Sequence, residues 1–319
     1  MQVYRNLDEI PKNFGATIVS VGNFDGVHRA HQLVLKRVVT RAHELKAKSI
    51  AVTFDPHPVA VLRPEAAPKL LTPTERKLEL LAQSGVEAAL VIPFTKDFSH
   101  MTAPEFGADV LHDRLRAREV HEGANFRFGN RAQGNVQQLQ QLGRGLGFEV
   151  QIYPELRVRG ELVSSSRIRE LIGQGSVGNA RALLGRVFSI RAHPSRGRGY
   201  GTRYTVPTIN LSDYAGLVPA NGVYITRTRI DHESFESVTN VGVRPTFENA
   251  SFAIESHLFE FHAMDVSENA TVEICFLRRL REERKFPSPD ALRQQIAHDV
   301  ARSKRYFRLA PFRADTIPR

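Results

Sequence analysis

Cysteine is almost absent from the chain. Among its 319 residues only Cys275 carries a thiol, so no disulfide can form within the chain and no cysteine cluster can bind a metal ion. The residue lies in the apolar run Val-Glu-Ile-Cys-Phe at 272–276. A cysteine in such a run is predicted to be a buried, unreactive thiol.

Long hydrophobic runs are absent as well. Nowhere do about 18 apolar residues follow one another, which is the length that a membrane-spanning helix needs. The segment from Met1 to Asn13 is polar and mixed in charge, unlike a secretion signal. We therefore expect a globular protein that works in the cytoplasm without contacting a membrane. The sequence gives no indication of the oligomeric state.

The chain is basic, with 44 Lys and Arg against 34 Asp and Glu and a net charge of +10. An excess of positive charge suits anionic ligands such as nucleotides, and it would also suit nucleic acid. The basic residues are dispersed along the sequence, however, and the second half has no row of aromatic side chains on which bases could stack. A nucleic-acid partner is therefore not expected, although a basic nucleic-acid-binding protein remains the alternative of a different class.

The length exceeds one typical domain of roughly 100 to 200 residues, so two cores are expected. The first part alternates short β-rich runs with helical patterns, which is typical of a parallel α/β sheet. Capping boxes that begin at Thr72 and Thr102 predict two of its helices. The strands are expected at 16–21, 49–54, 86–92, 118–121 and 148–153, and a pair of helices at 166–184.

The pattern changes beyond Arg186. Runs at 222–226, 252–261 and 271–276, separated by turn residues, are typical of a small antiparallel barrel. A final helix is predicted after Ser288, because the apolar residues Leu292, Ile296, Val300 and Phe307 keep helical spacing. The fold class is therefore α/β, with an N-terminal Rossmann-like parallel sheet in domain 1–186 and a C-terminal antiparallel β-barrel with a terminal helix in domain 187–319.

A glycine-containing loop follows the first expected strand. Residues 21–31 read Val-Gly-Asn-Phe-Asp-Gly-Val-His-Arg-Ala-His, and Leu35, Val38, Val39 and Ala42 then keep the spacing of one helix face. The loop therefore leads into a helix N-terminus, where free N–H groups and the helix dipole favour anions. Its glycines allow the backbone to approach a phosphate closely.

His28 and His31 begin this helix on one face, because they are three residues apart. A pair with this spacing is by itself typical of two surface histidines. Beside a phosphate-binding loop, however, imidazoles can stabilise the charge of a phosphoryl or nucleotidyl group during its transfer.

In this context the pair resembles the His-x-Gly-His signature of the nucleotidyltransferase superfamily. In its extended form the segment resembles the prokaryotic bifunctional riboflavin kinase/FAD synthetases, with Ala30 where that family usually has glycine. The resemblance implies that the loop binds ATP and flavin. The loop residues concerned are Gly22, Asn23, Phe24, Asp25 and Gly26.

Three later segments agree with that family in order and spacing. Residues 53–58 (Thr-Phe-Asp-Pro-His-Pro) follow an expected parallel strand, whose end should face ligand. Residues 122–129 (Glu-Gly-Ala-Asn-Phe-Arg-Phe-Gly) resemble the family's Asn/Asp-Phe-x-Phe-Gly segment and imply a binding role for Asn125. Residues 164–169 (Ser-Ser-Ser-Arg-Ile-Arg) resemble its Ser-Ser-x-Arg-x-Arg. The last motif implies phosphate binding by Ser164, Ser165, Ser166, Arg167 and Arg169.

The resemblance further implies a reaction for the first domain, which would be an FMN adenylyltransferase (FAD synthetase). The phosphate of FMN attacks the α-phosphorus of ATP, and FAD and pyrophosphate are formed. His28 and His31 would stabilise the transition state, and Mg²⁺ would neutralise the departing pyrophosphate.

The second domain resembles riboflavin kinase. Residues 207–210 (Pro-Thr-Ile-Asn) match the family's Pro-Thr-Ala-Asn, which implies that Thr208 and Asn210 bind Mg²⁺ together with ATP. Glu255, in the segment Ile-Glu-Ser-His-Leu, would be the base that accepts the proton of riboflavin's 5′-hydroxyl. Taken alone, Thr and Asn near a turn are commonly structural.

The barrel also departs from the family. Thr205 and Val206 replace Gly-Phe, Ile209 replaces alanine, and the family's Asp-Leu-Tyr-Gly segment is changed near 265–269. Either the kinase works with an altered loop, or the barrel is impaired while the first domain still makes FAD. Because Thr208, Asn210 and Glu255 are all retained, the working kinase is favoured. A nucleotidyltransferase for another substrate, such as phosphopantetheine, would leave the second domain unexplained.

Overall fold

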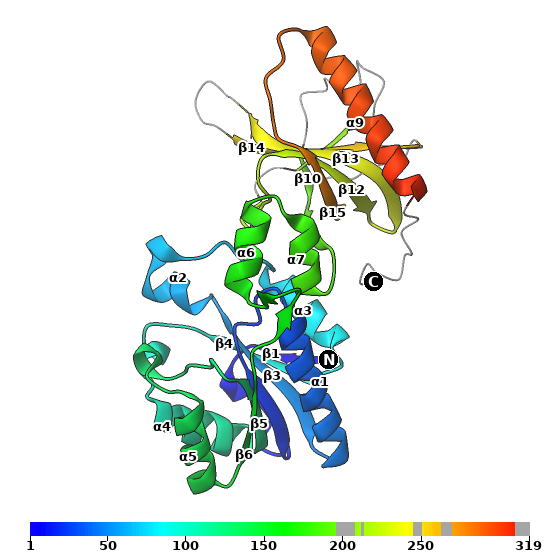
Figure 1. Cartoon of the computed structure of the whole chain (residues 1–319). Coiled ribbons are helices and arrows are strands. Elements are labelled where there is room, and N and C mark those ends of the chain that lie inside the picture. The colour runs from blue at the N-terminus through cyan, green and yellow to red at the C-terminus, as the bar shows by residue number, and fades with distance from the viewer. Residues whose placement is uncertain (196–207, 212–213, 245–250, 263–269, 310–319) are drawn as a thin grey trace. The chain divides into compact units, whose positions relative to one another are not determined.

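The computed structural model describes residues 1–195, 208–211, 214–244, 251–262 and 270–309. The chain forms two compact units, Met1–Ser165 and Ser166–Arg319 (Figure 1). Both helices of segment 166–184 are predicted to belong to the first domain. In the structure they belong to the second unit, which begins at Ser166. The predicted domain boundary at residue 186 stays a prediction.

The first unit contains a parallel sheet of six strands in the order β1-β4-β3-β2-β5-β6. The buried strand β2 lies between β3 and β5, and the strand order therefore places its carboxyl end near the middle of the sheet edge. All five strands predicted for the first domain are present, and β1 adds a sixth. The strands are β1 (Gln2–Tyr4), β2 (Thr17–Val21), β3 (Lys48–Asp55), β4 (Ala88–Pro93), β5 (Ala117–Gly123) and β6 (Glu149–Tyr153), and a separate hairpin consists of β7 (Arg157–Val158) and β8 (Glu161–Leu162).

Helices cover both faces of this sheet (Figure 1). Because side chains alternate along a strand, Ala51 of β3 packs with α1 and α3 in one apolar cluster, while Ile50 and Val52 pack with η4 and α5 in the other. The helices are η1 (Leu7–Glu9), α1 (Arg29–Glu44), α2 (Pro58–Leu62), η2 (Pro64–Ala66), α3 (Thr74–Gln83), η3 (Phe98–His100), α4 (Ala103–Glu105), η4 (Phe106–Arg114), η5 (Asn130–Ala132) and α5 (Val136–Leu146).

One of the two predicted capping boxes is present. Thr102 and Glu105 exchange side-chain and backbone hydrogen bonds at the start of α4, as expected. The box predicted at Thr72 is wrong, because α3 begins at Thr74 with Pro73 as its N-cap and no side-chain cap. The hydroxyl of Thr72 instead accepts a hydrogen bond from the backbone of Gly26 (3.0 Å). A long-range contact has replaced the local cap.

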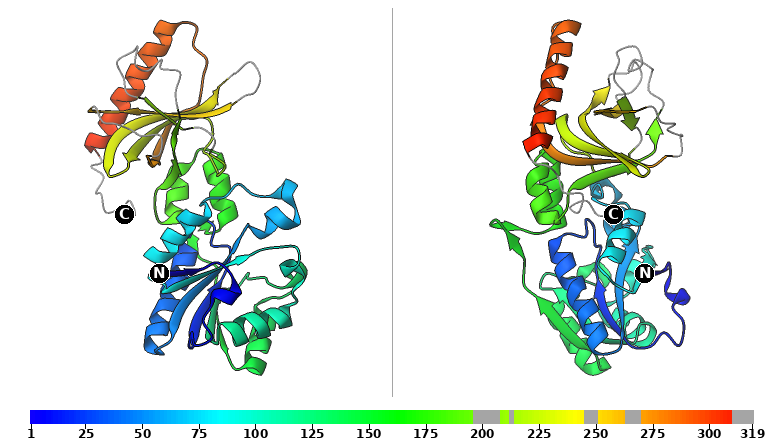
Figure 2. Two further views of the ribbon diagram at one scale, coloured as in Figure 1. Left: turned by 180° about the vertical axis from the view of Figure 1, so that it is seen from behind. Right: turned by 90° about the vertical axis from the view of Figure 1, so that its right-hand side faces the viewer.

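The second unit contains an antiparallel sheet of seven strands in the order β10-β11-β14-β13-β12-β15-β9. Figure 2 shows its strong curvature, as expected for a small barrel. Its elements are α6 (Ser165–Gly173), α7 (Val177–Leu184), β9 (Phe188–Ala192), β10 (Pro194–Ser195), β11 (Thr208–Leu211), β12 (Gly222–Ile230), β13 (Glu233–Arg244), β14 (Ser251–Leu258), β15 (Val272–Arg281) and α9 (Pro289–Leu309).

A closed ring of hydroxyl groups is buried in this sheet. The hydroxyls of Thr226, Ser237, Thr228, Ser256 and Thr239 are joined in that order, and Thr239 is joined back to Thr226, at 2.6–3.0 Å. All five residues are fully buried. Each hydroxyl therefore has two partners, which offsets the cost of removing it from water.

Helix α9 covers the other face through Val300 and Phe307, which pack against β12 and β13. The helix predicted after Ser288 is confirmed, but Leu292 and Ile296, which share the helical spacing of Val300 and Phe307, are 41% and 45% exposed. Helical periodicity marks these residues as one face, but it does not say how far the sheet extends beneath the helix. The predicted burial of Cys275 is confirmed.

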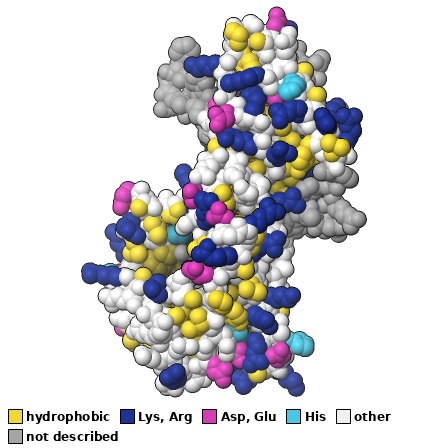
Figure 3. Space-filling model, in the orientation of Figure 1, with side chains coloured by type: hydrophobic (Ala, Val, Ile, Leu, Met, Phe, Trp, Pro, Cys, Tyr) yellow, Lys and Arg dark blue, Asp and Glu magenta, His cyan; other side chains and the backbone are white. Residues whose placement is uncertain are grey.

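The surface reflects the composition. Figure 3 shows Lys and Arg side chains spread over both units on this face, with Asp and Glu between them. Among the described residues, no helix is long and apolar enough to cross a membrane.

Candidate active sites

The loop between β2 and α1 is strained. Phe24, Gly26 and Val27 have φ angles of 46°, 86° and 35°, in the region that side chains with a Cβ atom rarely adopt. For a β-branched residue such as Val27 this conformation is unusual, and it persists only where the surroundings impose it. Contacts with the rest of the protein therefore maintain the backbone conformation of the loop, which the conformational preferences of its own residues do not favour.

Asp25 provides several of these contacts. Its carboxylate, which is 3% exposed, accepts hydrogen bonds from the N–H groups of Leu71 (3.1 Å) and Thr72 (3.0 Å). The Thr72 hydroxyl donates to the same carboxylate at 3.3 Å. The Asp25 and Phe24 side chains are both buried, so these two residues shape the loop from within.

The loop ends at His28, which is the N-cap of α1. Nδ1 of His28 accepts the backbone N–H of His31 at 3.4 Å, and the two imidazole rings are stacked with centroids 3.6 Å apart. Because Nδ1 acts as the acceptor, the ring proton of a neutral His28 is on Nε2. The edge of Phe24 packs on His31 at 5.1 Å and holds the second ring in place.

The serine motif meets this loop directly. The hydroxyl of Ser165 donates to the carbonyl of Asp25 at 2.8 Å, so residues 140 positions apart in the sequence are joined. Ser164 is half-buried and Ser166 is exposed. Arg167 and Arg169 lie on α6 in the second unit, where Arg167 pairs with Glu170 at 2.7 Å. Their roles stay predictions.

Asn125 is exposed at the tip of a tightly packed turn. On either side of it the chain is anchored by Ala124, whose N–H bonds to the carbonyl of Tyr153, and by the stacked rings of Phe126 and Phe128. A Cβ atom on Gly129 would lie 2.6 Å from the backbone nitrogen of Ala103, so only glycine fits there. This packing explains why the segment contains two phenylalanines and a glycine, and it leaves Asn125 exposed to solvent.

Lys77 is a residue that the sequence analysis missed. It lies on α3 and is only 6% exposed. Its ammonium group donates to the carbonyl of Asn23 (3.3 Å), the hydroxyl of Thr53 (3.0 Å) and the carbonyl of Phe54 (3.2 Å). It therefore ties the loop to the carboxyl end of β3. Helix periodicity alone would give this position to an apolar residue, and nothing local in the sequence indicates its partners.

Glu122 is the first residue of segment 122–129, and the sequence did not indicate a role for it. Its carboxyl group is buried and accepts the N–H of Val21 at 2.6 Å. Burial raises the pKa of Glu122 well above its usual value, and the hydrogen bond from Val21 only partly opposes this rise. Glu122 thus fixes the end of β2, directly before the loop.

The second unit brings the predicted kinase residues onto one face. Asn210 of β11 pairs in register with Glu255 of β14, which pairs on its other side with Asn240 of β13. Directly opposed residues on neighbouring strands have Cβ atoms about 4.5–5.5 Å apart. Thr208 is on the same face as Asn210, because it is two residues away. Asn240 extends this row, and sequence reasoning gave it no role.

The same alternation settles where Ile209 points. It pairs with Ser256, a member of the buried hydroxyl ring, and so it lies on the opposite face from Thr208 and Asn210. Its bulk therefore does not reach the polar row. Thr205, Val206 and the segment 265–269 lie outside the described residues.

His257 lies next to this row, opposite Thr208. Burial, together with the smaller effect of the positive charge of Lys304 on α9, lowers the pKa of His257 to about 4. The imidazole is neutral at physiological pH as a result.

The donor atoms of this face suit a hard cation. A hydroxyl, an amide oxygen and a carboxylate are the ligands that Mg²⁺ prefers when nucleotide phosphates complete its shell. Within the described part of the chain, no cluster of three or more His, Cys, Asp or Glu side chains could hold a metal ion by itself.

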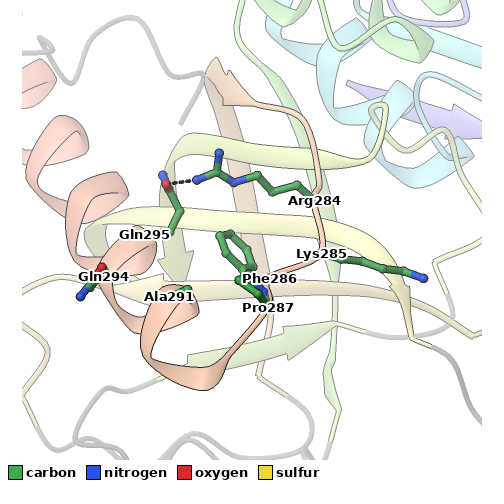
Figure 4. Close-up of a pocket in the computed structure, with 7 residues that line it drawn as sticks. All are labelled: Arg284, Lys285, Phe286, Pro287, Ala291, Gln294 and Gln295. Atoms are coloured by element: carbon green, nitrogen blue, oxygen red, sulfur yellow. Dashed lines mark hydrogen bonds between the residues drawn. The ribbon is translucent and has the colours of Figure 1, made fainter.

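A separate open cavity of about 450 Å³ lies between the end of β15 and α9. Figure 4 shows Arg284 hydrogen-bonded to Gln295 of α9, near the ring of Phe286. The guanidinium of Arg284 is 5.0 Å from the Phe286 ring centroid. None of the predicted kinase residues lines this cavity.

Comparison with protein families gives two matches. A model described as FAD synthetase matches residues 10–167, which include the loop, His28, His31 and the serine motif as far as Arg167. A model described as riboflavin kinase matches residues 184–307, which include the row around Glu255.

Similar whole proteins carry both parts. A bifunctional riboflavin kinase/FMN adenylyltransferase from Pseudomonas fluorescens is 34% identical over 95% of this chain and 97% of its own length. Proteins of the same name from Haemophilus influenzae and Escherichia coli K12 are 31% and 30% identical. They cover 96% and 95% of this chain and 99% and 96% of their own lengths.

One solved structure is similar over both units. A macrolide-efflux protein from Streptococcus pneumoniae has a TM-score of 0.85 and 26% identity, covering 95% of this chain and 98% of that one. Its name refers to export. A shared fold does not by itself carry a function, and both family models describe flavin-related enzymes.

Proposed function

The chain belongs to the family of bifunctional riboflavin kinase/FMN adenylyltransferases, and we propose that its loop at His28 transfers AMP to FMN and its row at Glu255 phosphorylates riboflavin. The enzyme is both a riboflavin kinase and an FMN adenylyltransferase. It converts riboflavin and ATP to FMN and ADP, and then FMN and ATP to FAD and pyrophosphate. Each family match contains its own set of reactive side chains. This observation supports the assignment of one reaction to each of the two sites.

In adenylyl transfer, a phosphate oxygen of FMN attacks the α-phosphorus of ATP and the bond to pyrophosphate breaks. Negative charge increases on the oxygens of that phosphorus. His28 can donate from Nε2, because its Nδ1 accepts the N–H of His31. The buried, stacked ring is fixed before the reaction, and fixed donors stabilise developing charge most effectively. The ring of His31 stacks on that of His28 and supports its position.

The remaining residues of the first site position the phosphates. The loop from Gly22 to Gly26 sets the course of the backbone towards α1, whose N-terminus favours anions. Ser164, Ser165 and Ser166 add hydroxyl and N–H groups, and Ser165 is already joined to the loop. Asn125 is exposed and available to a substrate. Arg167 and Arg169 stay predicted phosphate ligands.

In the kinase reaction, the 5′-hydroxyl of riboflavin attacks the γ-phosphorus of ATP, and Glu255 accepts the hydroxyl proton. Asn210 and Asn240 flank Glu255 on the two neighbouring strands. Thr208 and Asn210 would hold Mg²⁺. When bound, that ion neutralises charge on the ATP phosphates. The position of Ile209 on the opposite face supports a working kinase.

The proposal is tested by incubating the purified protein with Mg-ATP and either riboflavin or FMN, and separating the flavins by chromatography. We expect FMN and FAD from riboflavin, and FAD from FMN. FAD from FMN alone would mean that the altered barrel has lost its kinase activity. The absence of FAD from both reactions, together with salt-sensitive RNA binding, would favour the nucleic-acid alternative. Activity on free flavins in the cytoplasm, without a nucleic-acid partner, stays a prediction.

A further inference from the structure

Lys77 is a buried cation whose hydrogen-bond partners are neutral, although the carboxylates of Asp55 and Asp25 lie nearby. Its three hydrogen bonds go to two carbonyl oxygens and one hydroxyl, which use all three N–H donors of an ammonium group. Transferring a charge from water to such a site is costly, and apolar side chains of similar size commonly give equal or better stability. Stability alone therefore does not explain a lysine at this position.

The contacts of Lys77 are concentrated at the first site. Asn23 opens the strained loop, and its carbonyl accepts hydrogen bonds from Lys77 and from Thr53 (3.2 Å). Thr53 and Phe54 end the central strand β3, whose carboxyl end lies at the ligand-binding edge of a parallel sheet. The ammonium group thus fastens the first residues of the loop, while Asp25 and Thr72 fasten its middle.

The loop transmits this restraint to His28. Only four residues separate Asn23 from His28, and three of them have positive φ angles. A backbone in this conformation is not maintained by local preference. If the carbonyl of Asn23 is released, the loop can relax and change the position of the histidine rings.

We propose that Lys77 is a positioning residue for adenylyl transfer, which holds the loop of residues 22–27 so that His28 and His31 face the reacting phosphate. This role rests on the adenylyltransferase function proposed above. The effect of Lys77 on the reaction is indirect, through the backbone of Asn23.

Lys77→Met tests this role, because methionine has a similar length and lacks the charge and the donors. We expect kcat for FAD formation from FMN to fall roughly 10- to 100-fold, as for a small misplacement of reacting groups. The KM values for FMN and ATP should change less than about threefold, because the lost interaction acts in the transition state. FMN formation from riboflavin on the same chain should be unchanged. Lys36→Met removes an exposed lysine from α1 and serves as the matched control.

The dependence of adenylyl transfer on pH gives a second measurement. The shape of this profile, unlike the absolute rate, does not depend on the fraction of the variant that is folded. Burial lowers the pKa of Lys77, and the nearby carboxylates of Asp55 and Asp25 partly restore it. Wild-type adenylyl transfer should lose activity on the alkaline side, at a pH below the usual lysine value of about 10.5. This loss should be missing from Lys77→Met.

The outcomes separate the two proposals. Absence of FAD formation by the wild type would overturn the adenylyltransferase function and this role with it. If the wild type is active, three results would overturn the role of Lys77 alone. These are a kcat within twofold of wild type in Lys77→Met, an equal loss of both reactions, and an alkaline loss that persists in the variant.

Discussion

The imidazole rings of His28 and His31 are stacked at 3.6 Å, with their planes inclined by 16°, and His28 also caps the helix that carries both residues. A substitution of His28 could therefore affect either the chemistry or the helix start. The two effects can be separated by the choice of side chain, because Asn is among the best N-cap residues and cannot replace the Nε2 donor.

We expect His28→Asn to retain the melting temperature of the wild type and to lose FAD formation from FMN by roughly 100- to 1,000-fold, the usual effect of removing one fixed donor. FMN formation from riboflavin should be unaffected. The exposed His43 on the same helix provides the control His43→Asn. A variant that keeps full adenylyltransferase activity would show that the ring of His28 takes no part in the reaction.

The converse change is Glu255→Gln. It keeps the size and the hydrogen bonding of the side chain but removes the base, so FMN formation should fall by roughly 10²- to 10⁴-fold. FAD formation from added FMN should stay at the wild-type rate, as measured by chromatography of both flavins. Glu282→Gln, at a carboxylate that is 85% exposed, is the matched control. Equal loss of both activities would contradict two separate sites.

The hydroxyl ring predicts an unusual response to conservative mutation. Thr228→Val breaks the ring and removes a partner from both Ser237 and Ser256. The free energy of unfolding should fall by about 1–3 kcal/mol, which is the cost of leaving buried polar groups unpaired. Thr271→Val, at an exposed threonine of the same unit, should change it by less than about 0.5 kcal/mol.

Urea unfolding followed by circular dichroism measures this difference, since the chain has no tryptophan to report by fluorescence. If the two valine variants had equal free energies of unfolding, the hydrogen bonds of the ring would contribute nothing to stability beyond the packing of its side chains.

His257 predicts a dependence of stability on pH. In the unfolded chain His257 binds a proton below about pH 6.5, whereas in the folded protein burial and Lys304 hold its pKa at about 4. Between these values the unfolded state binds more protons, so stability falls as the pH is lowered from about 6.5 to 4. Melting curves of His257→Gln should show a smaller loss over this interval. An identical loss in wild type and variant would mean that His257 does not couple to folding.

Much of the fold follows from patterns that are local in the sequence. Strand β2 and helix α1 are specified by a run of buried residues and by one helical face, and both are found where they were predicted. The capping box at Thr102 was predicted for the same reason, since all its atoms lie within one turn. The loop with His28 was identified because segment 21–31 resembles a family motif over one short stretch of sequence.

Contacts between distant segments could not be predicted in this way. Thr72 has the local pattern of a cap, but its hydroxyl binds the loop 46 positions earlier. Lys77 reaches Asn23 across 54 positions, and a helical pattern gives no indication of this partner. Asn240 joins the row of Glu255 only through the register of β13 with β14. These positions depend on tertiary packing, which a single sequence does not encode locally.

One chain is expected to transfer two different phosphorus groups of ATP to a flavin. The most direct measurement gives the wild-type enzyme ATP labelled with ³²P at either the α- or the γ-position. From riboflavin, FAD should carry label from both kinds of ATP, and from FMN, FAD should carry the α-label alone. Flavins that carry neither label, or FAD from FMN that carries the γ-label, would contradict the account.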